Sequence, residues 1–179
     1  AIDCSIPSNS KFCKDDHKIE KTPTVKYFPP NAILPPVQMK EELQNDKDKM
    51  KKKLIKQIPS KVQTLTKENE GAFMIDNSEK PKIVLFSKQD KPSWIFKALS
   101  SAPVLERTLE FAFTSDADLV KKYEKKFGKG KKLPALLMFR NGGKDVEKYK
   151  GDMNFRDIKE WANTYSGIFY LSGFLVFRF

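Results

Sequence analysis

The sequence predicts an α/β fold in which helices flank a mixed sheet. The first observation is the order of patterns between Ser60 and Ser166, where strand-like runs alternate with helical segments as β-α-β-α-β-α-β-β-α. The second is the Asn141-Gly142 dipeptide, a strong hairpin signal that makes the last two strands antiparallel. The third is a hydrophobic content of 39% with 14 Phe, enough for a sizeable core in 179 residues. Helices between strands allow parallel pairing, so the terminal hairpin makes the sheet mixed.

The strands follow from runs of apolar residues. A continuous apolar run after Lys80-Pro81 predicts a buried strand, and another begins at Pro134 and is broken by Asn141-Gly142. Residues after this dipeptide should return antiparallel. The predicted strands are 62–65 (VQTL), 82–86 (KIVLF), 109–113 (LEFAF), 134–140 (PALLMFR) and 146–150 (VEKYK).

The first two helices of this region follow from short apolar faces. Residues 67–75 (KENEGAFMI) predict a short helix after the first strand. Asp90 and Pro92 predict the cap and first turn of a helix that carries Trp94 and ends before Pro103.

The last two helices follow from capping residues and longer apolar faces. Ser115 with Asp118 predicts the start of a helix, and Gly128 suits its C-terminus. Either Asp152 or Asn154 caps the final helix, whose apolar face consists of Phe155, Ile158, Trp161, Ala162 and Tyr165.

The N-terminal third has a different organisation. Residues 8–19 predict a helix and residues 24–28 (TVKYF) an alternating strand, which leads into the proline-rich connector 29–36 (PPNAILPP). A long polar helix from Val37 to Gln57 follows. Its apolar stripe consists of Met39, Leu43, Met50 and Leu54.

Charge and composition restrict the possible partners. The formal net charge is +11, but nearly all basic residues are Lys, whereas surfaces that read nucleic-acid sequence rely on Arg. The lysines near residues 47–53 alternate with acidic residues, which favours a solvated surface over nucleic-acid binding. Cys4, Cys13 and His17 are the only cysteines and histidine, so we expect no metal site and no cofactor.

The C-terminal residues 167–179 (GIFYLSGFLVFRF) are almost entirely apolar. This run is shorter than the roughly 20 residues that span a bilayer. Two interpretations stay open: the tail begins a membrane anchor, or it docks on a protein surface. We expect any targeting peptide to lie outside the sequence.

Residues 59–166 resemble a thioredoxin-like domain. KIVLF resembles its central strand, LPALLMFRNG (133–142) the segment that carries the family's cis-proline, and residues 149–166 its closing strand and helix. Residues 1–36 resemble the C-terminal half of another such domain, with AIDC (1–4) similar to its third strand and KTPTVKYFPP (21–30) to its cis-proline strand. The expected organisation is a partial thioredoxin-like half-domain (1–36), a lysine-rich amphipathic helix (37–58), a complete thioredoxin-like domain (59–166) and the tail (167–179).

Within this superfamily, residues 1–30 are similar to protein disulfide isomerases and quiescin-type sulfhydryl oxidases. Residues 80–101 also resemble redox-silent modules in isomerases and in membrane-anchored J-domain proteins of the endoplasmic reticulum. The resemblance implies the lumen of the endoplasmic reticulum or the secretory pathway, with or without a membrane anchor. The residues alone leave Cys4 and Cys13 as a structural disulfide or as two buried thiols, and the resemblance favours the disulfide.

The resemblance also identifies two candidate binding loops. Thr22-Pro23 and Leu133-Pro134 match the family's cis-proline loop, which faces the redox motif and contacts substrate. The alternative for both is a turn proline that only fixes the start of a strand.

Thiol exchange needs a Cys-X-X-Cys motif at a helix N-terminus. The matching position holds Asp90, Lys91, Pro92, Ser93 and Trp94 and contains no cysteine, so we expect no catalytic residue in this chain. The predicted function is a redox-inactive module that binds polypeptide or a protein partner noncovalently. Two alternatives stay open: part of a disulfide oxidoreductase whose Cys-X-X-Cys lies upstream of residue 1, and a structural subunit of a membrane assembly that contacts lipid through residues 167–179.

Overall fold

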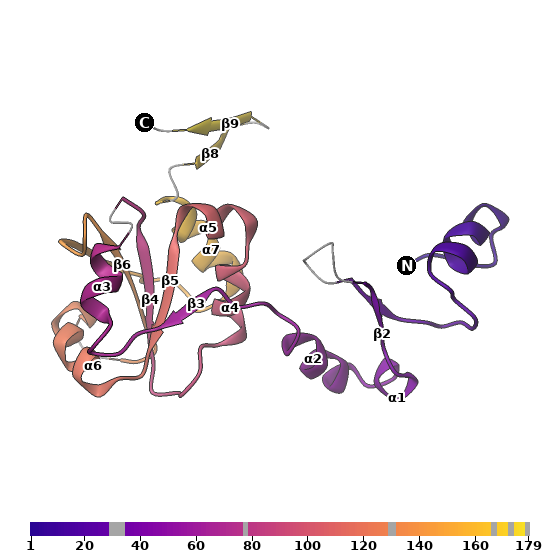
Figure 1. Ribbon diagram of the computed structural model, residues 1–179, viewed down its shortest axis with the longest axis horizontal. Coiled ribbons are helices and arrows are strands. Elements are labelled where there is room, and N and C mark those ends of the chain that lie inside the picture. Colours follow the sequence, from indigo (N-terminus) through magenta and orange to yellow (C-terminus); the bar gives the residue numbers. More distant parts are fainter. Residues whose placement is uncertain (29–34, 77–78, 129–131, 166–167, 172–173, 178–179) are drawn as a thin grey trace. The chain divides into compact units, whose positions relative to one another are not determined.

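The computed structural model divides the chain into two compact units, Ala1–Gln57 and Ile58–Phe179 (Figure 1). It describes residues 1–28, 35–76, 79–128, 132–165, 168–171 and 174–177, with backbone only for residues 43, 44 and those beyond 165. Most of the predicted connector 29–36, residues 129–131 of the lysine-rich segment KGKK (129–132) and part of the tail therefore lie outside the described residues. The two units are described separately below.

Unit 1 is built from short elements. The 3-10 helix η1 (Pro7–Asn9) and the π-helix η2 (Lys11–Asp16) occupy the segment predicted to be helical. The strand β1 (Lys26–Tyr27) pairs antiparallel with β2 (Val37–Gln38), and α1 (Glu41–Gln44) and α2 (Lys47–Ile55) follow. Residues 1–4 (AIDC), which resemble a strand in sequence, form none.

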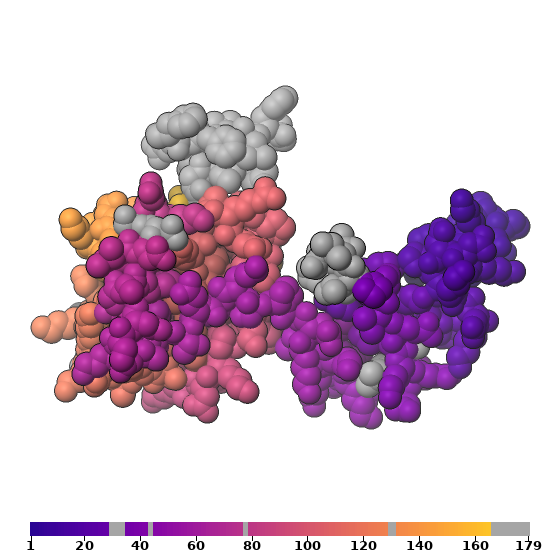
Figure 2. Space-filling model, in the orientation of Figure 1, coloured from indigo at the N-terminus to yellow at the C-terminus, as the bar shows by residue number. Residues whose placement is uncertain are grey.

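The predicted single helix from Val37 to Gln57 is wrong. Val37 lies opposite Tyr27 in the β1–β2 pair, and the Met39 N–H donates to the Val25 carbonyl at 2.9 Å. Asp46 then caps α2, because its carboxylate accepts from the backbone N–H groups of Asp48 and Lys49. No side chain of α2 is buried, and the helix is exposed in the space-filling view (Figure 2).

Unit 2 contains a five-stranded mixed sheet in the order β3-β5-β4-β6-β7, as the alternating pattern predicts (Figure 1). β3, β5 and β4 run parallel, whereas β6 pairs antiparallel with both β4 and β7. The central position of β4 explains why all five of its residues are buried. The strands are β3 (Val62–Thr64), β4 (Lys82–Phe86), β5 (Glu110–Thr114), β6 (Ala135–Arg140) and β7 (Asp145–Lys148).

Helices cover both faces of this sheet. One apolar cluster joins Ile83 and Leu85 of β4 to the helices α4 (Trp94–Ser100), α5 (Pro103–Thr108) and α7 (Phe155–Asn163). The other joins Val84 and Phe86 to α3 (Glu70–Ile75), α6 (Ala117–Tyr123) and the 3-10 helix η3 (Glu124–Phe127). The alternation of side chains along a strand directs neighbouring residues of β4 into opposite layers.

Two predicted caps are wrong by one to three residues. Ser93, not Asp90, caps α4, and its Oγ accepts from the Phe96 N–H at 3.3 Å. Asp116, not Ser115, caps α6 by accepting from the N–H groups of Asp118 and Leu119. Since Ser and Asp are equally good caps, composition alone does not separate such neighbours.

Of the two predicted caps of the final helix, Asn154 is correct, and its Oδ1 accepts from the Asp157 N–H at 2.9 Å. The sequence analysis did not predict α5, for which Pro103 supplies the first turn after a break at Ser101 and Ala102.

The hairpin between β6 and β7 has a longer turn than the two residues that Asn141-Gly142 suggests. Arg140 lies opposite Asp145, so residues 141–144 form the connection. Asn141, Gly142 and Gly143 have φ angles of 52°, 64° and 84°. These left-handed conformations explain why Asn and Gly occupy the turn.

The tail contains the strands β8 (Ile168–Leu171) and β9 (Phe174–Phe177), which pair antiparallel. Across the described part of the chain, no helix combines the length and apolarity that a membrane span requires. The two interpretations of the tail stay predictions.

Candidate functional site

The candidate site lies where the C-terminal end of β4 meets the start of β6. In the antiparallel pairing of these strands, Phe86 lies opposite Ala135. The loop after β4, which leads to Ser93, is therefore adjacent to Pro134, which precedes β6. Two predicted segments 40 residues apart in sequence thus meet at one edge of the sheet.

A hollow of about 370 Å³ lies at this junction, and we call it the proline hollow. The lining residue Ser87 is buried, and its Oγ accepts from the Gln89 N–H at 3.1 Å. Leu133 is half-buried and Pro134 is exposed. The hollow is lined by Leu85, Ser87, Lys88, Gln89, Ser93, Ile95, Leu133, Pro134 and Met153.

The predicted degenerate redox-motif position, residues 90–94, contributes one residue to the lining of the proline hollow. Only Ser93 of its five predicted residues lines the hollow, and its oxygen is engaged as the α4 cap. Asp90 and Lys91 are exposed and Pro92 is half-buried in the preceding bend. Trp94 is the first residue of α4 and is 41% exposed.

Several exposed apolar residues are lining residues of this hollow or are close to lining residues in the sequence. Trp94 lies between the lining residues Ser93 and Ile95, and Phe155 follows the lining residue Met153 by two positions. Met153 and Phe155 are 40% and 36% exposed. Among the described residues of unit 2, the other large apolar side chain with such exposure is Ile75, at the end of α3.

Sequence reasoning missed several lining residues. Ser87 and Lys88 directly follow a buried strand, a position at which loops converge on a sheet edge, and this signal was available in the sequence. Met153 and Ile95 carry no such signal. Met153 precedes the Asn154 cap, and its position depends on how the chain returns from β7 to α7.

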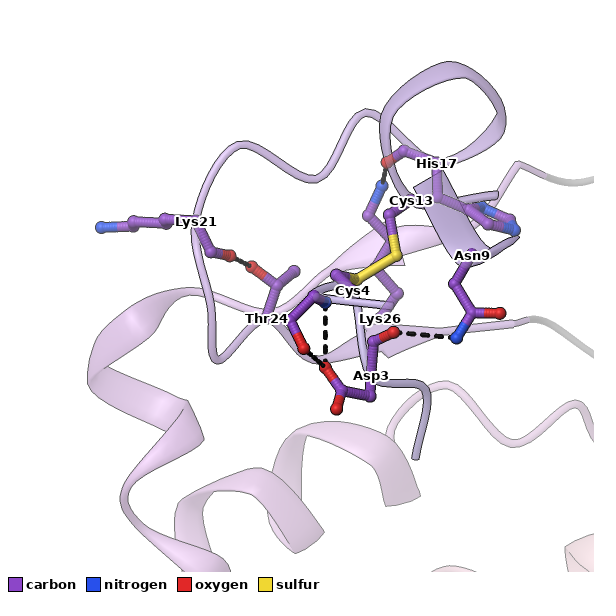
Figure 3. Close-up of a disulfide and its surroundings, with 9 residues drawn as sticks. Asp3, Cys4, Asn9, Cys13, His17, Lys21, Thr24 and Lys26 are labelled. Carbon is purple, nitrogen blue, oxygen red and sulfur yellow. Dashed lines mark hydrogen bonds between the residues drawn. A yellow bond between two sulfur atoms is a disulfide. The ribbon is translucent and has the colours of Figure 1, made fainter. Parts of the chain in front are cut away.

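In unit 1, Cys4 and Cys13 form a disulfide with an S–S distance of 2.05 Å (Figure 3). Cys13 is buried. The Asp3 carboxylate accepts from the Ser5 N–H at 2.9 Å, and this bond lowers the pKa of Asp3. Asn9 donates to the Asp3 carbonyl at 2.8 Å, which fixes the segment between the cysteines. Both cysteines of the sequence are thus in this disulfide, so the chain has no free thiol.

The predicted loop Thr22-Pro23 lines a hollow of about 740 Å³ beside this disulfide. The His17 ring packs against Phe12 and Phe28, with ring centroids 4.2 and 5.4 Å away, and the hollow includes all three. The Lys26 ammonium donates to the His17 carbonyl (Figure 3). The peptide bonds before Pro23 and Pro134 are both cis.

No group of three or more His, Cys, Asp or Glu side chains suited to a metal ion occurs within the described ranges. The proline hollow offers apolar surface, the hydroxyls of Ser87 and Ser93, the Gln89 amide and the Lys88 ammonium.

Comparisons with known proteins identify the fold. No protein-family model and no curated protein matches the sequence. Among solved structures, ERdj5 in crystal form II has a TM-score of 0.51 and 17% identity, covering 93% of this chain and 22% of ERdj5. Human ERp44 in form I (TM-score 0.44, 20% identity) covers 59% of this chain and 29% of its own. The match to the thioredoxin NaTrxh from Nicotiana alata has a TM-score of 0.45 and 19% identity, and covers 60% of this chain and 94% of NaTrxh.

The chain therefore spans less than a third of these ERdj5 and ERp44 structures. Sequence identities of 20% or less indicate a shared fold and do not assign a function to this chain. The described residues of unit 2 form a five-stranded mixed sheet between two helical layers. The chain has a thioredoxin-like fold.

Proposed function

We propose that unit 2 is a redox-silent thioredoxin-like module that binds an extended polypeptide noncovalently in the proline hollow. The observation that carries the proposal is the position of this hollow between Ser93 and Pro134, with the lining residue Met153 40% exposed. A peptide side chain in the hollow would remove this apolar surface from water. The absence of any free thiol in the sequence supports binding without disulfide exchange.

The disulfide also supports a location in the secretory pathway, including the endoplasmic reticulum, because structural disulfides persist in oxidising compartments. A protein that holds unfolded chains there would act as a chaperone in protein folding. Fluorescence microscopy of the tagged native protein tests this location, and a cytosolic distribution would contradict it.

A binding measurement with matched variants tests the peptide site. The probe is a fluorescent octapeptide with a central Leu flanked by Ser, titrated into the full chain. Complete burial of a Met side chain stabilises by about 1.5–3 kcal/mol. Since 40% of Met153 is exposed, covering it contributes about 0.6–1.2 kcal/mol. Met153→Ser should therefore weaken binding about three- to sevenfold.

Ile75→Ser is the control, because Ile75 is 74% exposed at the end of α3 and does not line the hollow. The control should bind as the unchanged chain does. Equal affinity of the unchanged chain and Met153→Ser, or no binding at all, would refute the proposed site. In the same samples the chain should not accelerate insulin reduction by dithiothreitol, and acceleration would refute redox silence.

Unit 1 favours a second candidate function, as part of a disulfide oxidoreductase. Ile2, Ile6, Phe12, Phe28 and Val37 are each more than a third exposed, and three of them line the hollow at Thr22-Pro23. An upstream half-domain with a Cys-X-X-Cys motif would cover such a surface. Sequencing of the upstream coding region tests this candidate: cysteines at that spacing would support it, and a start codon directly before Ala1 would eliminate it.

A further inference from the structure

A second hollow, of about 280 Å³, adjoins the proline hollow and is rimmed by lysines. The two hollows share Pro134 and Met153. The second one is also lined by Lys132, Lys148 and Lys150. We call it the lysine hollow.

The pairing of β6 with β7 brings these lysines together. Lys148 lies opposite Leu137, and the Tyr149 N–H donates to the Leu136 carbonyl at 3.0 Å. Lys150, which follows Tyr149, therefore lies near the start of β6. Lys132 lies near the same point, because it precedes Pro134. Lys148 donates to the Phe127 carbonyl, while Lys132 and Lys150 are exposed.

Positive charge continues on the other side of the proline hollow. Lys88 lines that hollow and Lys91 lies in the following bend. Across residues 87–93, 132–134 and 148–153 the sequence has five lysines and two aspartates, Asp90 and Asp152. The apolar hollow is thus flanked by an excess of positive charge.

We propose that the polypeptide bound by this module carries acidic residues next to the apolar side chain that fills the proline hollow. The inference rests on the proposed function, since it names the class of peptide that the same site selects. Exposed charge pairs contribute about 0.2–1 kcal/mol each, which corresponds to about 1.4- to fivefold in affinity per pair. Several such pairs together make the difference in affinity between an acidic and an uncharged peptide measurable. Salt screens these charge pairs and reduces that difference.

A nucleic acid would also complement the lysines. The apolar lining between the two lysine groups and the use of Lys in place of Arg favour a peptide. A single-stranded oligonucleotide is therefore included in the test as the competing class of partner.

The experiment compares three fluorescent octapeptides with the same central Leu, flanked by Asp, Ser or Lys, on the full chain. At about 0.1 M NaCl we expect the Asp peptide to bind about tenfold more tightly than the Ser peptide. At about 1 M NaCl the Debye length falls from about 10 Å to about 3 Å, and this ratio should fall to about two.

The lysine variants provide a matched comparison. Lys132→Ser/Lys150→Ser should remove most of the preference for the Asp peptide and leave the Ser peptide unaffected. Lys80→Ser/Lys144→Ser changes the net charge equally at the opposite end of the sheet, because Lys80 precedes β4 and Lys144 lies in the β6–β7 turn. This control should keep the preference.

Each failure has its own signature. If the three peptides bind equally and the lysine variants behave alike, the acidic preference is refuted while the peptide site stands. If no peptide binds, both the proposed function and this inference fail. If the oligonucleotide binds more tightly than the Asp peptide and loses affinity in Lys132→Ser/Lys150→Ser, the occupant is nucleic acid and the inference is overturned.

Discussion

Lys82 makes a buried ion pair in the central strand, and its removal should destabilise unit 2 strongly. Its side chain is 2% exposed, and its ammonium donates to the Glu110 carboxylate and to the Asp76 carbonyl. The ammonium also lies 4.9 Å from the centroid of the Phe73 ring. Lys82→Met keeps most of the apolar stem and leaves the Glu110 carboxylate, 16% exposed, without this cation.

Breaking a buried ion pair by removing one partner costs about 3–5 kcal/mol. Because Glu110 retains some contact with water, we expect the lower end, about 3 kcal/mol. In Lys82→Met/Glu110→Leu this carboxylate is removed as well, and the largest loss among the named contacts is then the bond to the Asp76 carbonyl, about 1 kcal/mol. The double variant should therefore be more stable than Lys82→Met by about 2 kcal/mol.

Urea unfolding followed by tryptophan fluorescence measures these differences. Both tryptophans of the sequence, Trp94 and Trp161, belong to unit 2, so the signal reports this unit alone. With a slope of about 2 kcal/mol per molar urea, Lys82→Met should lower the midpoint by about 1.5 M. A loss below about 1 kcal/mol, or a double variant less stable than Lys82→Met, would refute the buried ion pair.

Two further predictions concern the disulfide and a helix cap. Cys4→Ser/Cys13→Ser should lower the stability of unit 1 by roughly 2.5 kcal/mol, because the disulfide closes a loop with a sequence separation of 9. Hydrogen exchange at the Met39 amide, which bonds the Val25 carbonyl, should therefore accelerate. An unchanged exchange rate would contradict this stabilisation. The pKa of Asp116 is lowered mainly by the hydrogen bond from the Leu119 N–H, and less by those from the N–H groups of Lys67 and Asp118. The charged carboxylate therefore stabilises the folded state fully above the unfolded pKa, near 3.8, and this stabilisation is lost as the pH falls through the lowered folded pKa. Asp116→Asn should therefore be less stable than the unchanged chain at pH 7 and equal to it near pH 2, and a constant difference in urea titrations would contradict the charged cap.

The sheet of unit 2 could be predicted because each of its strands corresponds to a short apolar run in the sequence. The run 82–86 is apolar enough to be central, and Asn141-Gly142 marks the hairpin. Local pattern did not reveal that Lys82 within this run is buried with a partner from β5, since a charge at a strand end usually reaches water.

Unit 1 was harder to predict because its structure depends on contacts between distant residues. Val37 is the first residue of the predicted long helix, yet it pairs with Tyr27 as a strand. The Asp46 cap then divides the remaining helical pattern. Pairing and capping together replaced the predicted long helix by a strand and two shorter helices.

The candidate site was predictable in part. Pro134 and Ser93 were identified from the resemblance, and both line the proline hollow. Met153 and Lys150 were not, since their position beside Pro134 follows from the β6–β7 register and from the turn before α7. Residues brought to a site by tertiary structure leave no periodic signal in sequence.

The most direct test of binding without chemistry is an amide NMR titration of the full chain with the Ser-flanked octapeptide carrying a central cysteine in place of Leu. We predict shifts at the amides of residues 87–91, 93–95, Leu133 and Met153, with no disulfide-linked species in the mass spectrum of the sample. Shifts confined to residues 1–28 would contradict binding in the proline hollow, and a covalent adduct, which could form only through Cys4 or Cys13, would contradict binding by the chain without disulfide exchange.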